Sequence, residues 1–583
     1  MRKIIFSGIF ICFIVIPLYV NAQVLAGTDD LGRTLLQNDA VGDPKQGRHI
    51  ALFYFLWQGD KTSPTSPRQW DLYELSIHHP EVFEDSNHPN WGGKKGTYYF
   101  WGEPVYGYYR GDDYWVHLRN IQLLTDANVD LLVIDATNRL SYPTQSEALM
   151  KAMDAVRAQG KTPPKIAYYT NKSSDQTIQG IYEQFYKEGA PCRHPECWFY
   201  LDGKPLVIGL PEDVKDQRCI DFFTIRESQW PNKPYRANSW PWANITRKPK
   251  VHSNLRDERE IICVSVANNN TPEAMGGSAF YNFKDNWGRS YRNNRHGNPE
   301  TDVFYGYNIQ EQWEVALKED VPFIFVTGWN EWIAGRWEHW DKTHPERSYF
   351  CDLATPEYSR DIEPSLTAGL KDHYYMQMVN NIRRYKGVAK MTAVSALSFP
   401  LQVMGDWNKV EAVYADYTGD TQHRNHPGAQ SEPLVTYTNT TGRNDFHILK
   451  VAHNKDNLYF YAETTDDITP NTGYNWMRLY IDADGNFATG WKGYDYRIIG
   501  GSTVQRYLDG VWRNIDIAAV EYVVERNKMM ITLPRTLPFL ADRLNFEFKW
   551  SDNMQDDDPI DWYINGDVAP GGRFNYIYME NTP

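Results

Sequence analysis

Short apolar segments that alternate with segments of helical period constrain the fold most strongly. The apolar segments lack helical period and end in polar or aromatic residues, at 49–57, 129–134, 165–170, 205–209, 261–267 and 321–326. Segments with helical period lie between or after them, at 113–128, 145–159, 309–318 and 365–385. This alternation is typical of a parallel α/β sheet. We expect a (β/α)8 TIM-type barrel over 48–388, since no glycine-rich phosphate loop follows the first strand to favour an open doubly wound sheet.

The texture of the sequence changes after residue 388. From 392 to 583 short runs of alternating residues are separated by turn signals, and helical period is absent; examples are LYFYAET, MRLYIDADGN and LNFEFKW. Strands at this spacing predict an all-β sandwich. The chain is therefore expected to be multidomain, with a barrel followed by a sandwich.

The N-terminus has the pattern of a targeting signal. A cationic start (Met1 to Lys3) precedes an apolar run at 4–19 and small residues before Gln23. We expect residues 1–22 to be a signal peptide and 23–47 a leader with little structure of its own. The mature protein would then be exported, to the periplasm, the cell surface or the medium, with no integral membrane segment after signal removal.

Charge and composition narrow the partners. The formal net charge of −14, without a basic patch, argues against nucleic-acid binding. Aromatic residues make up 15%, and tyrosine and tryptophan suit wet ligands such as sugars. We expect a glycan partner, no organic cofactor and a monomer. Cys192 and Cys197 could close a small disulfide loop; a zinc site with His194 is the weaker alternative, because no second ligand pair follows.

The chemistry is predicted at Val321–Trp337, where a buried strand leads into Trp329-Asn330-Glu331-Trp332. In barrels of this type the reacting groups lie where strands give way to loops. Glu331 is the expected acid or acid/base, because packing against two indoles would raise its pKa. The alternative role is a structural glutamate that orients its neighbours.

Hydrolysis of a glycosidic bond needs a second carboxylate. Asp135 is a candidate because it ends the strand DLLVID, and Glu103 is another because it lies in the aromatic element WGEP. Their alternative roles are a loop cap and a salt bridge that fixes a loop. Asp361 is expected to be structural, since Arg360 is adjacent. The remaining predicted substrate contacts are Trp57, Trp101, Trp329 and Trp332, each of which could instead belong to the core, Asn171 and Asn330, which could instead orient a neighbour, and Tyr106 and Glu338.

The first domain resembles bacterial proteins of the glycoside hydrolase family 71/99-like group. The resemblance rests on FYFLW, FWGEPVYGYY, DLLVIDATN, TGWNEW and PEYSRDIEP, which occur in the family's order. It implies a barrel and a role in glycan hydrolysis. One departure concerns the endo-α-mannosidase branch, which has a second glutamate three residues after the first. Here that position is Ala334, so that branch's mechanism and mannan specificity are not carried over.

The C-terminal region resembles a carbohydrate-binding module of the family 9-like β-sandwich type, on GDWNKVEA, NLYFYAETTDD and RLYIDADGNFATGW. Within it, Asp482 and Asp484 form half of a calcium-loop pattern, although a plain turn explains the same residues. Trp476, Trp491 and Trp512 could line a sugar cleft or form core.

These observations predict an exported glycoside hydrolase that cleaves a polysaccharide or oligosaccharide with two carboxylates. The alternative is a catalytically inactive barrel that binds glycans, consistent with Ala334. A third reading is a carbohydrate lyase or esterase. Sugar, linkage, endo or exo action and stereochemistry are open at this stage.

Overall fold

The structure is a computed structural model. It describes residues 24–59, 71–268, 286–337, 345–350, 355–431, 434–473, 475–517, 520–537 and 544–581. The predicted signal peptide and Glu338 lie outside these ranges.

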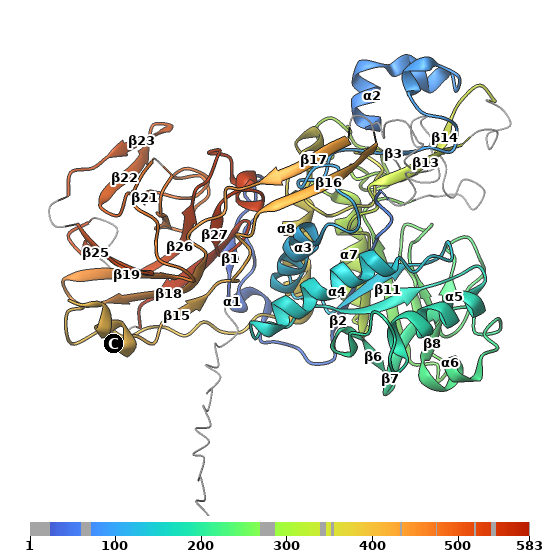
Figure 1. Cartoon of the computed structure of the whole chain (residues 1–583), viewed down its shortest axis with the longest axis horizontal. Helices are drawn as coiled ribbons and strands as arrows, with labels where there is room; N and C mark the ends of the chain where they lie inside the picture. Colours follow the sequence, from blue (N-terminus) through green and yellow to red (C-terminus); the bar gives the residue numbers. More distant parts are fainter. Residues whose placement is uncertain are drawn as a thin grey trace, which may run out of the picture.

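The first domain is a nearly closed barrel of parallel strands (Figure 1). In sheet order the parallel strands are β11 (Arg259–Ser265), β12 (Phe323–Thr327), β2 (His49–Tyr54), β4 (Leu131–Asp135), β5 (Lys165–Tyr169), β7 (Lys204–Gly209), β8 (Thr224–Gln229) and β9 (Ser239–Pro241). Strand β10 (Val251–Ser253) pairs antiparallel with β11. All five residues of β4 are buried, as expected for a strand covered on both faces.

The gap between β9 and β11 is closed without a continuous ladder. The backbone N–H of Asn238 donates to the carbonyl of Ser253 at 2.7 Å, which ties β9 to β10. The indole N–H of Trp240 donates to Oε2 of Glu260 on β11 at 2.8 Å. These bonds satisfy buried polar groups at the point where no pairing between described strands closes the barrel.

Helices cover the outside of the barrel. They are α3 (Tyr114–Asp126), α4 (Pro143–Ala158), α5 (Ser174–Ile181), α6 (Gln217–Phe222), α7 (Tyr307–Glu319) and α8 (His373–Lys386). Helix α4 buries Leu149, Met150, Met153 and Val156, the stripe expected of an amphipathic helix. Within the described residues no helix joins β8 to β9 or β9 to β10. No helix in these residues is both long and apolar enough to cross a membrane.

The predicted barrel is confirmed, with local differences. The last helix begins at His373 and not at Ser365, because residues 365–372 form a turn in which Ala368 has a φ of 53°. The stretch 229–254 contains the short strands β9 and β10, which were not predicted. Helices α5 and α6 were not predicted.

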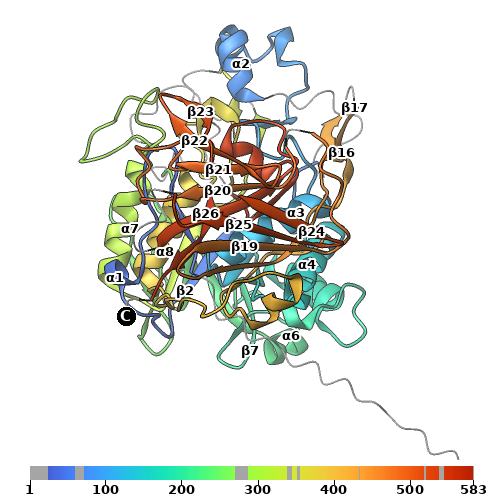
Figure 2. The same cartoon turned by 90° about the vertical axis from the view of Figure 1, so that its left-hand side faces the viewer.

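The second domain is built from two antiparallel sheets (Figure 2). One has the order β15 (Val413–Ala415), β18 (Phe446–His453), β19 (Asn457–Thr464), β25 (Lys528–Pro534), β24 (Glu521–Glu525). The other has the order β1 (Ala26–Gly27), β28 (Phe574–Met579), β26 (Asn545–Asp552), β20 (Arg478–Asp482), β21 (Tyr496–Ile499), β22 (Thr503–Leu508), β23 (Val511–Asn514), with β27 (Asp567–Ala569) paired to β26. Their inner faces share one apolar core that includes Leu449, Phe460, Leu479 and Phe548.

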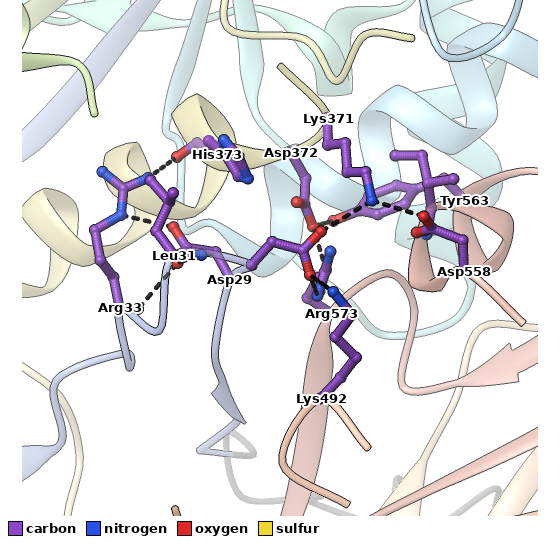
Figure 3. A network of polar contacts seen from close by, with 12 residues as sticks. Asp29, Leu31, Arg33, Lys371, Asp372, His373, Lys492, Asp558, Tyr563 and Arg573 are labelled. Carbon is purple, nitrogen blue, oxygen red and sulfur yellow. Dashed lines mark hydrogen bonds and ion pairs between the residues drawn. The ribbon is translucent and has the colours of Figure 1, made fainter. Parts of the chain in front are cut away.

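The leader joins the two domains. Its strand β1 pairs with β28 of the sandwich, and Arg33 donates to the carbonyl of His373 in the barrel at 2.7 Å. Asp30 accepts from Lys371 of the barrel and from Lys492 of the sandwich, at 3.0 and 2.8 Å. Figure 3 shows both lysines pointing toward the leader. The leader was expected to have little structure of its own; it is instead held by contacts with both domains.

A hairpin of the sandwich domain also reaches the barrel. It consists of β16 (Arg424–Ser431) and β17 (Leu434–Asn439), and Figure 1 shows it lying over the barrel side of the molecule. Arg424 pairs with Asp113, the N-cap of α3, at 2.8 Å. The hydroxyl of Tyr437 accepts the backbone N–H of Tyr108 at 2.8 Å. The segment 108–113, which leads into α3, therefore contacts the second domain.

Candidate functional site

The side chain of Glu331 lies at the carboxyl end of β12. Its side chain is 12% exposed, and its Oε2 lies 3.5 Å from Nη2 of Arg360. The guanidinium of Arg360 lies over the ring of Trp242, 5.2 Å from the centroid. Trp242 belongs to the aromatic filling of the barrel interior with Phe53 and Phe55. A carboxylate, a guanidinium and an indole thus meet at the barrel mouth.

The segment 356–364 contacts the backbone of Glu331 through Asp361. The backbone N–H of Glu331 donates to Asp361, whose other oxygen accepts the indole N–H of Trp101 at 2.7 Å. Trp101 stacks on Trp332 with ring centroids 4.6 Å apart. Asp361 is therefore engaged by groups of the scaffold, in keeping with the structural role expected for it.

A second acid, Glu363, lies under the same tryptophan. It accepts hydrogen bonds from the indole N–H of Trp332, from Tyr109 and from Asn120, the last two at 2.7 and 2.8 Å. Burial raises the pKa of Glu363 to about 7. Sequence reasoning passed over Glu363, and its position in PEYSRDIEP beside Asp361 was the available signal.

The neighbours of Glu331 in sequence form part of the core. Trp329, Asn330 and Trp332 are 0% exposed. Asn330 bonds both backbone groups of Phe55, accepting at 2.8 Å and donating at 3.0 Å. Because these side chains have no exposed face, the structure places them in the support of the site and not against a substrate, which differs from the predicted sugar contacts.

Asp135 ends β4 at the same end of the barrel as Glu331. Its Oδ1 accepts the backbone N–H and the hydroxyl of Thr137, at 3.1 and 2.7 Å, so it also caps its loop. Strands β4 and β12 both flank β2, so their backbones are about 10 Å apart. Two carboxylates that point inward across this interval can reach the separations used by glycosidases, roughly 5–9.5 Å.

Trp57 and Asn171 also follow barrel strands. Trp57 is half-buried and packs against Phe55 and Tyr98, with centroid distances of 5.8 and 5.9 Å. Asn171 follows β5, and its side-chain oxygen accepts from Ser228 of β8 at 3.1 Å. Both residues therefore lie at the carboxyl end of the barrel strands.

Of the other predicted residues, Glu103 and Tyr106 have different surroundings from Glu331. The pKa of Glu103 is raised, mainly by burial and to a smaller extent by the nearby acids Asp71 and Glu74. Tyr106 is buried edge-on against Trp115, 5.4 Å between centroids. Trp101 is buried in the stack described above. The structure therefore joins Glu331 and Asp135 at one end of the barrel, and gives Glu103 and Tyr106 different surroundings.

Ala334 lies in a short antiparallel strand that follows the loop of Glu331. Strand β13 (Ile333–Trp337) pairs with β3 (Tyr98–Phe100), with Ala334 opposite Tyr99. Ala334 is 3% exposed. This position of β13 therefore offers no carboxylate.

Mouth residues missed by sequence reasoning include Arg360, Trp230 and Trp242. The indoles of Trp230 and Trp242 meet edge-on at 5.2 Å. They lie on either side of β9 in the sequence. The pattern SWPW around Trp242 was the available signal.

Candidate metal ligands occur only in the second domain, as far as the described residues go. Asp482 and Asp484 join Asp495 in a group of carboxylates with oxygens within 4.8 Å of one another, and Asp420, Asp445 and Asp567 form another. Cys192 and Cys197 are not joined by a disulfide, and His194 pairs with Asp154 at 2.6 Å. No cysteine belongs to a described metal-like group.

The tryptophans of the sandwich differ in their surroundings. Trp476 is 1% exposed and belongs to the core between the sheets. Trp491 and Trp512 are half-buried and pack around Tyr480, with centroids 5.7 and 6.4 Å from its ring. Only the latter two present part of their rings to solvent.

Comparisons with known proteins give a remote likeness. No family model matches the sequence, and no curated protein matches it. Two solved structures of the GH99 endo-α-mannosidase from Bacteroides thetaiotaomicron, the second in complex with bis-tris-propane, are similar at 13% identity. Each comparison covers 58% of this chain and 97% of the other, with TM-scores of 0.33 and 0.31. A likeness this low concerns the fold alone, so the function must be argued from the site.

Proposed function

We propose that the barrel hydrolyses glycosidic bonds and that Glu331 is one of its two reacting carboxylates. The observation that carries this proposal is the position of Glu331: a partly exposed carboxylate at the carboxyl end of β12, beside Arg360 and Trp242. Reacting groups of TIM-type barrels lie at this end. An aromatic-lined mouth suits the apolar faces of a sugar ring.

The ion pair suggests the role of Glu331. A guanidinium at 3.5 Å favours the charged form of a carboxylate, which suits a nucleophile or a base that activates water. The acid role expected from the sequence assumed that Trp329 and Trp332 would wall the carboxylate. Both indoles are instead buried in the scaffold.

A charged Glu331 leaves the proton donor's role to a second carboxylate, for which we propose Asp135. In this scheme Asp135 protonates the departing glycosidic oxygen as its bond to the anomeric carbon breaks. Glu331 either attacks that carbon itself or takes a proton from the water that attacks it. Both bonds from Thr137 fall on Oδ1 of Asp135, so the transferred proton would be carried by Oδ2.

The test is a panel of oligosaccharides and polysaccharides assayed for new reducing ends. With the cleaved substrate in hand, Glu331→Gln and Asp135→Asn are each expected to lower kcat by 10³-fold or more. Glu188→Gln is the matched control, because the side chain of Glu188 is 94% exposed. Full turnover by Glu331→Gln would remove Glu331 from the mechanism.

A second candidate function is glycan binding without catalysis. Its support is Ala334, which occupies the position of a second carboxylate in the mannosidase branch and is buried in β13. Calorimetry against the same panel separates the two candidates. Binding of one glycan, with no cleavage of any, would favour the binding protein. Release of an unsaturated sugar or a free acid would instead favour a lyase or an esterase.

Two proposals concern the rest of the chain. The sandwich is proposed to hold a sugar against Trp491 and Trp512. Trp512→Ala should then weaken binding of a glycan to the whole protein without changing kcat on the cleaved substrate.

Export of the chain is proposed from residues 1–22. Replacement of the apolar run at 4–19 by polar residues should retain the protein in the cytoplasm of an expression host.

A further inference from the structure

We propose that Asp420, Asp445 and Asp567 bind a divalent cation, with Ca²⁺ the best fit, at the seam between the sandwich and the barrel. Asp420 lies in the loop between β15 and β16, Asp445 directly precedes β18, and Asp567 begins β27. The site joins three segments that are far apart in sequence, and it lies against α3 of the barrel through Arg119.

The geometry of the carboxylates suits a calcium ion. One oxygen from each aspartate lies within 4.8 Å of the other two. Ca²⁺ binds oxygen at about 2.3–2.6 Å, so ligands on opposite sides of it stand up to roughly 5 Å apart. Mg²⁺ binds at about 2.0–2.1 Å and requires a tighter, octahedral arrangement. All donors of the group are oxygens, which is what both ions prefer over zinc-type ligands.

Few cations balance these acids. Arg119 donates to Oδ2 of Asp420 at 3.1 Å. Backbone N–H groups of Phe446 and Val568 bond Asp567, at 2.6 and 2.8 Å. Asp445 accepts the backbone N–H of Gly419 at 2.9 Å and the hydroxyl of Thr465 at 2.9 Å. Neutral donors order the carboxylates but do not cancel their charge, and burying charge without compensation is costly.

A separate observation points to a ligand. Asp420 is only 4% exposed, and its Oδ1 is buried and has no hydrogen-bond partner among the described residues. Asp420 also lines a cavity together with Gln122, whose Nε2 is likewise buried and without a partner there. A cation that carries water would satisfy the oxygen directly and the amide through a bound water.

The group formed by Asp482, Asp484 and Asp495 serves as an internal control. Asp484 is exposed, and its oxygens accept from Asn486 and Thr489, at 2.9 and 3.0 Å. No buried unpartnered oxygen is found among these three in the described structure. Asp484→Asn therefore removes any contribution of that group and leaves the proposed site intact.

The experiment compares Asp484→Asn with Asp484→Asn/Asp420→Asn after removal of metal by EDTA. Position 420 is chosen because asparagine can keep the bond to Arg119 while losing the charge. Calorimetry with Ca²⁺ should give one ion per chain for the single variant and none for the double. Tb³⁺ luminescence excited through tryptophan should show the same loss, since Trp562 lines the same cavity. At a calcium concentration of 100 Kd, the Tm of the single variant should rise by about 5–10 °C.

Asp445→Asn in the same background provides a second route to the loss of binding, should the first double variant unfold. In EDTA both double variants are expected to melt at or above the Tm of Asp484→Asn, because each removes a repulsive charge. The proposal fails if Asp484→Asn binds no calcium at millimolar concentration. It also fails if the double variants bind calcium as tightly as Asp484→Asn does.

Discussion

The guanidinium of Arg573 donates to Oδ2 of Asp372 at 2.8 Å, and both side chains are buried where the two domains meet (Figure 3). Arg573 directly precedes strand β28 of the sandwich, and Asp372 directly precedes helix α8 of the barrel. Arg573 also lies 3.0 Å from Asp30 of the leader. Three parts of the chain therefore share one buried cation.

Arg573→Ala is expected to destabilise the contact between the domains by about 3–5 kcal/mol, since Asp372 would keep a buried charge without the guanidinium that pairs with it, whereas Asp30 keeps Lys371 and Lys492. Differential scanning calorimetry should show one domain melting earlier and separately. Arg513→Ala is the control, because Arg513 is 56% exposed and its pair with Asp509 is solvated, so its removal should change the Tm little. An unchanged calorimetric profile in Arg573→Ala would show that the seam does not couple the domains.

Glu363 should make stability depend on pH. Its folded-state pKa of about 7 lies above the ordinary 4.5, so between these values the folded chain holds a proton that the unfolded chain releases. The free energy of unfolding from this group is therefore greatest below pH 4.5 and falls by up to about 3 kcal/mol as pH rises through 7. Glu363→Gln should remove this component.

The measurement for Glu363 is the difference between wild type and variant in urea unfolding from pH 5 to pH 8. The difference matters because burial also raises the pKa values of Glu357 and Asp482 to about 7, and both act with the same sign. A wild-type and variant difference that stays constant with pH would contradict the raised pKa of Glu363.

The barrel was predictable because its strands carry their own signal. Segments such as 131–135 and 165–169 are continuous apolar runs, and their helices show a 3.6-residue period. Strand β9 was not predictable, since three residues are too few to show a period. Helix α8 was placed too far N-terminally because residues 365–372 are polar and apolar in a helical order, although a positive φ at Ala368 interrupts it.

The site was only partly predictable for a different reason. Position at a strand end indicated Glu331 and Asp135, and sequence order alone supports such an inference. Whether Trp332 faces a substrate depends on Glu363 and Trp101, which come from other segments of the chain. The partner of Glu331, Arg360, likewise comes from a loop that follows in sequence but returns under the strand. Such long-range contacts leave no periodic trace.

Gly107 should control docking of the β16–β17 hairpin. It has a φ of 72°, and a Cβ there would lie 2.4 Å from the ring of Tyr437. Gly107→Ala therefore adds an overpacking cost of about 1–3 kcal/mol to the cost of the left-handed backbone. Gly160 has a φ of 78° with nothing within 4 Å, so Gly160→Ala measures the backbone cost alone.

The comparison of the two glycine variants uses chemical denaturation and limited proteolysis. Gly107→Ala should be the less stable variant and should be cleaved faster within the hairpin. Equal losses of stability in both variants would indicate that the contact between Gly107 and Tyr437 adjusts at no cost.

Arg360 is expected to act on catalysis through Glu331 alone. Its guanidinium lies 3.5 Å from that carboxylate and over Trp242, and its backbone carbonyl accepts the N–H of Gly328 whatever the side chain is. Arg360→Gln should therefore lower kcat on the cleaved glycan by about tenfold or more while the fold is kept. In a double-mutant cycle, Arg360→Gln added to Glu331→Gln should cost almost nothing further, because the carboxylate on which it acts is already gone. Additive losses in the double variant would mean that Arg360 contacts the substrate itself, and the ion pair would then be a resting arrangement that substrate binding breaks.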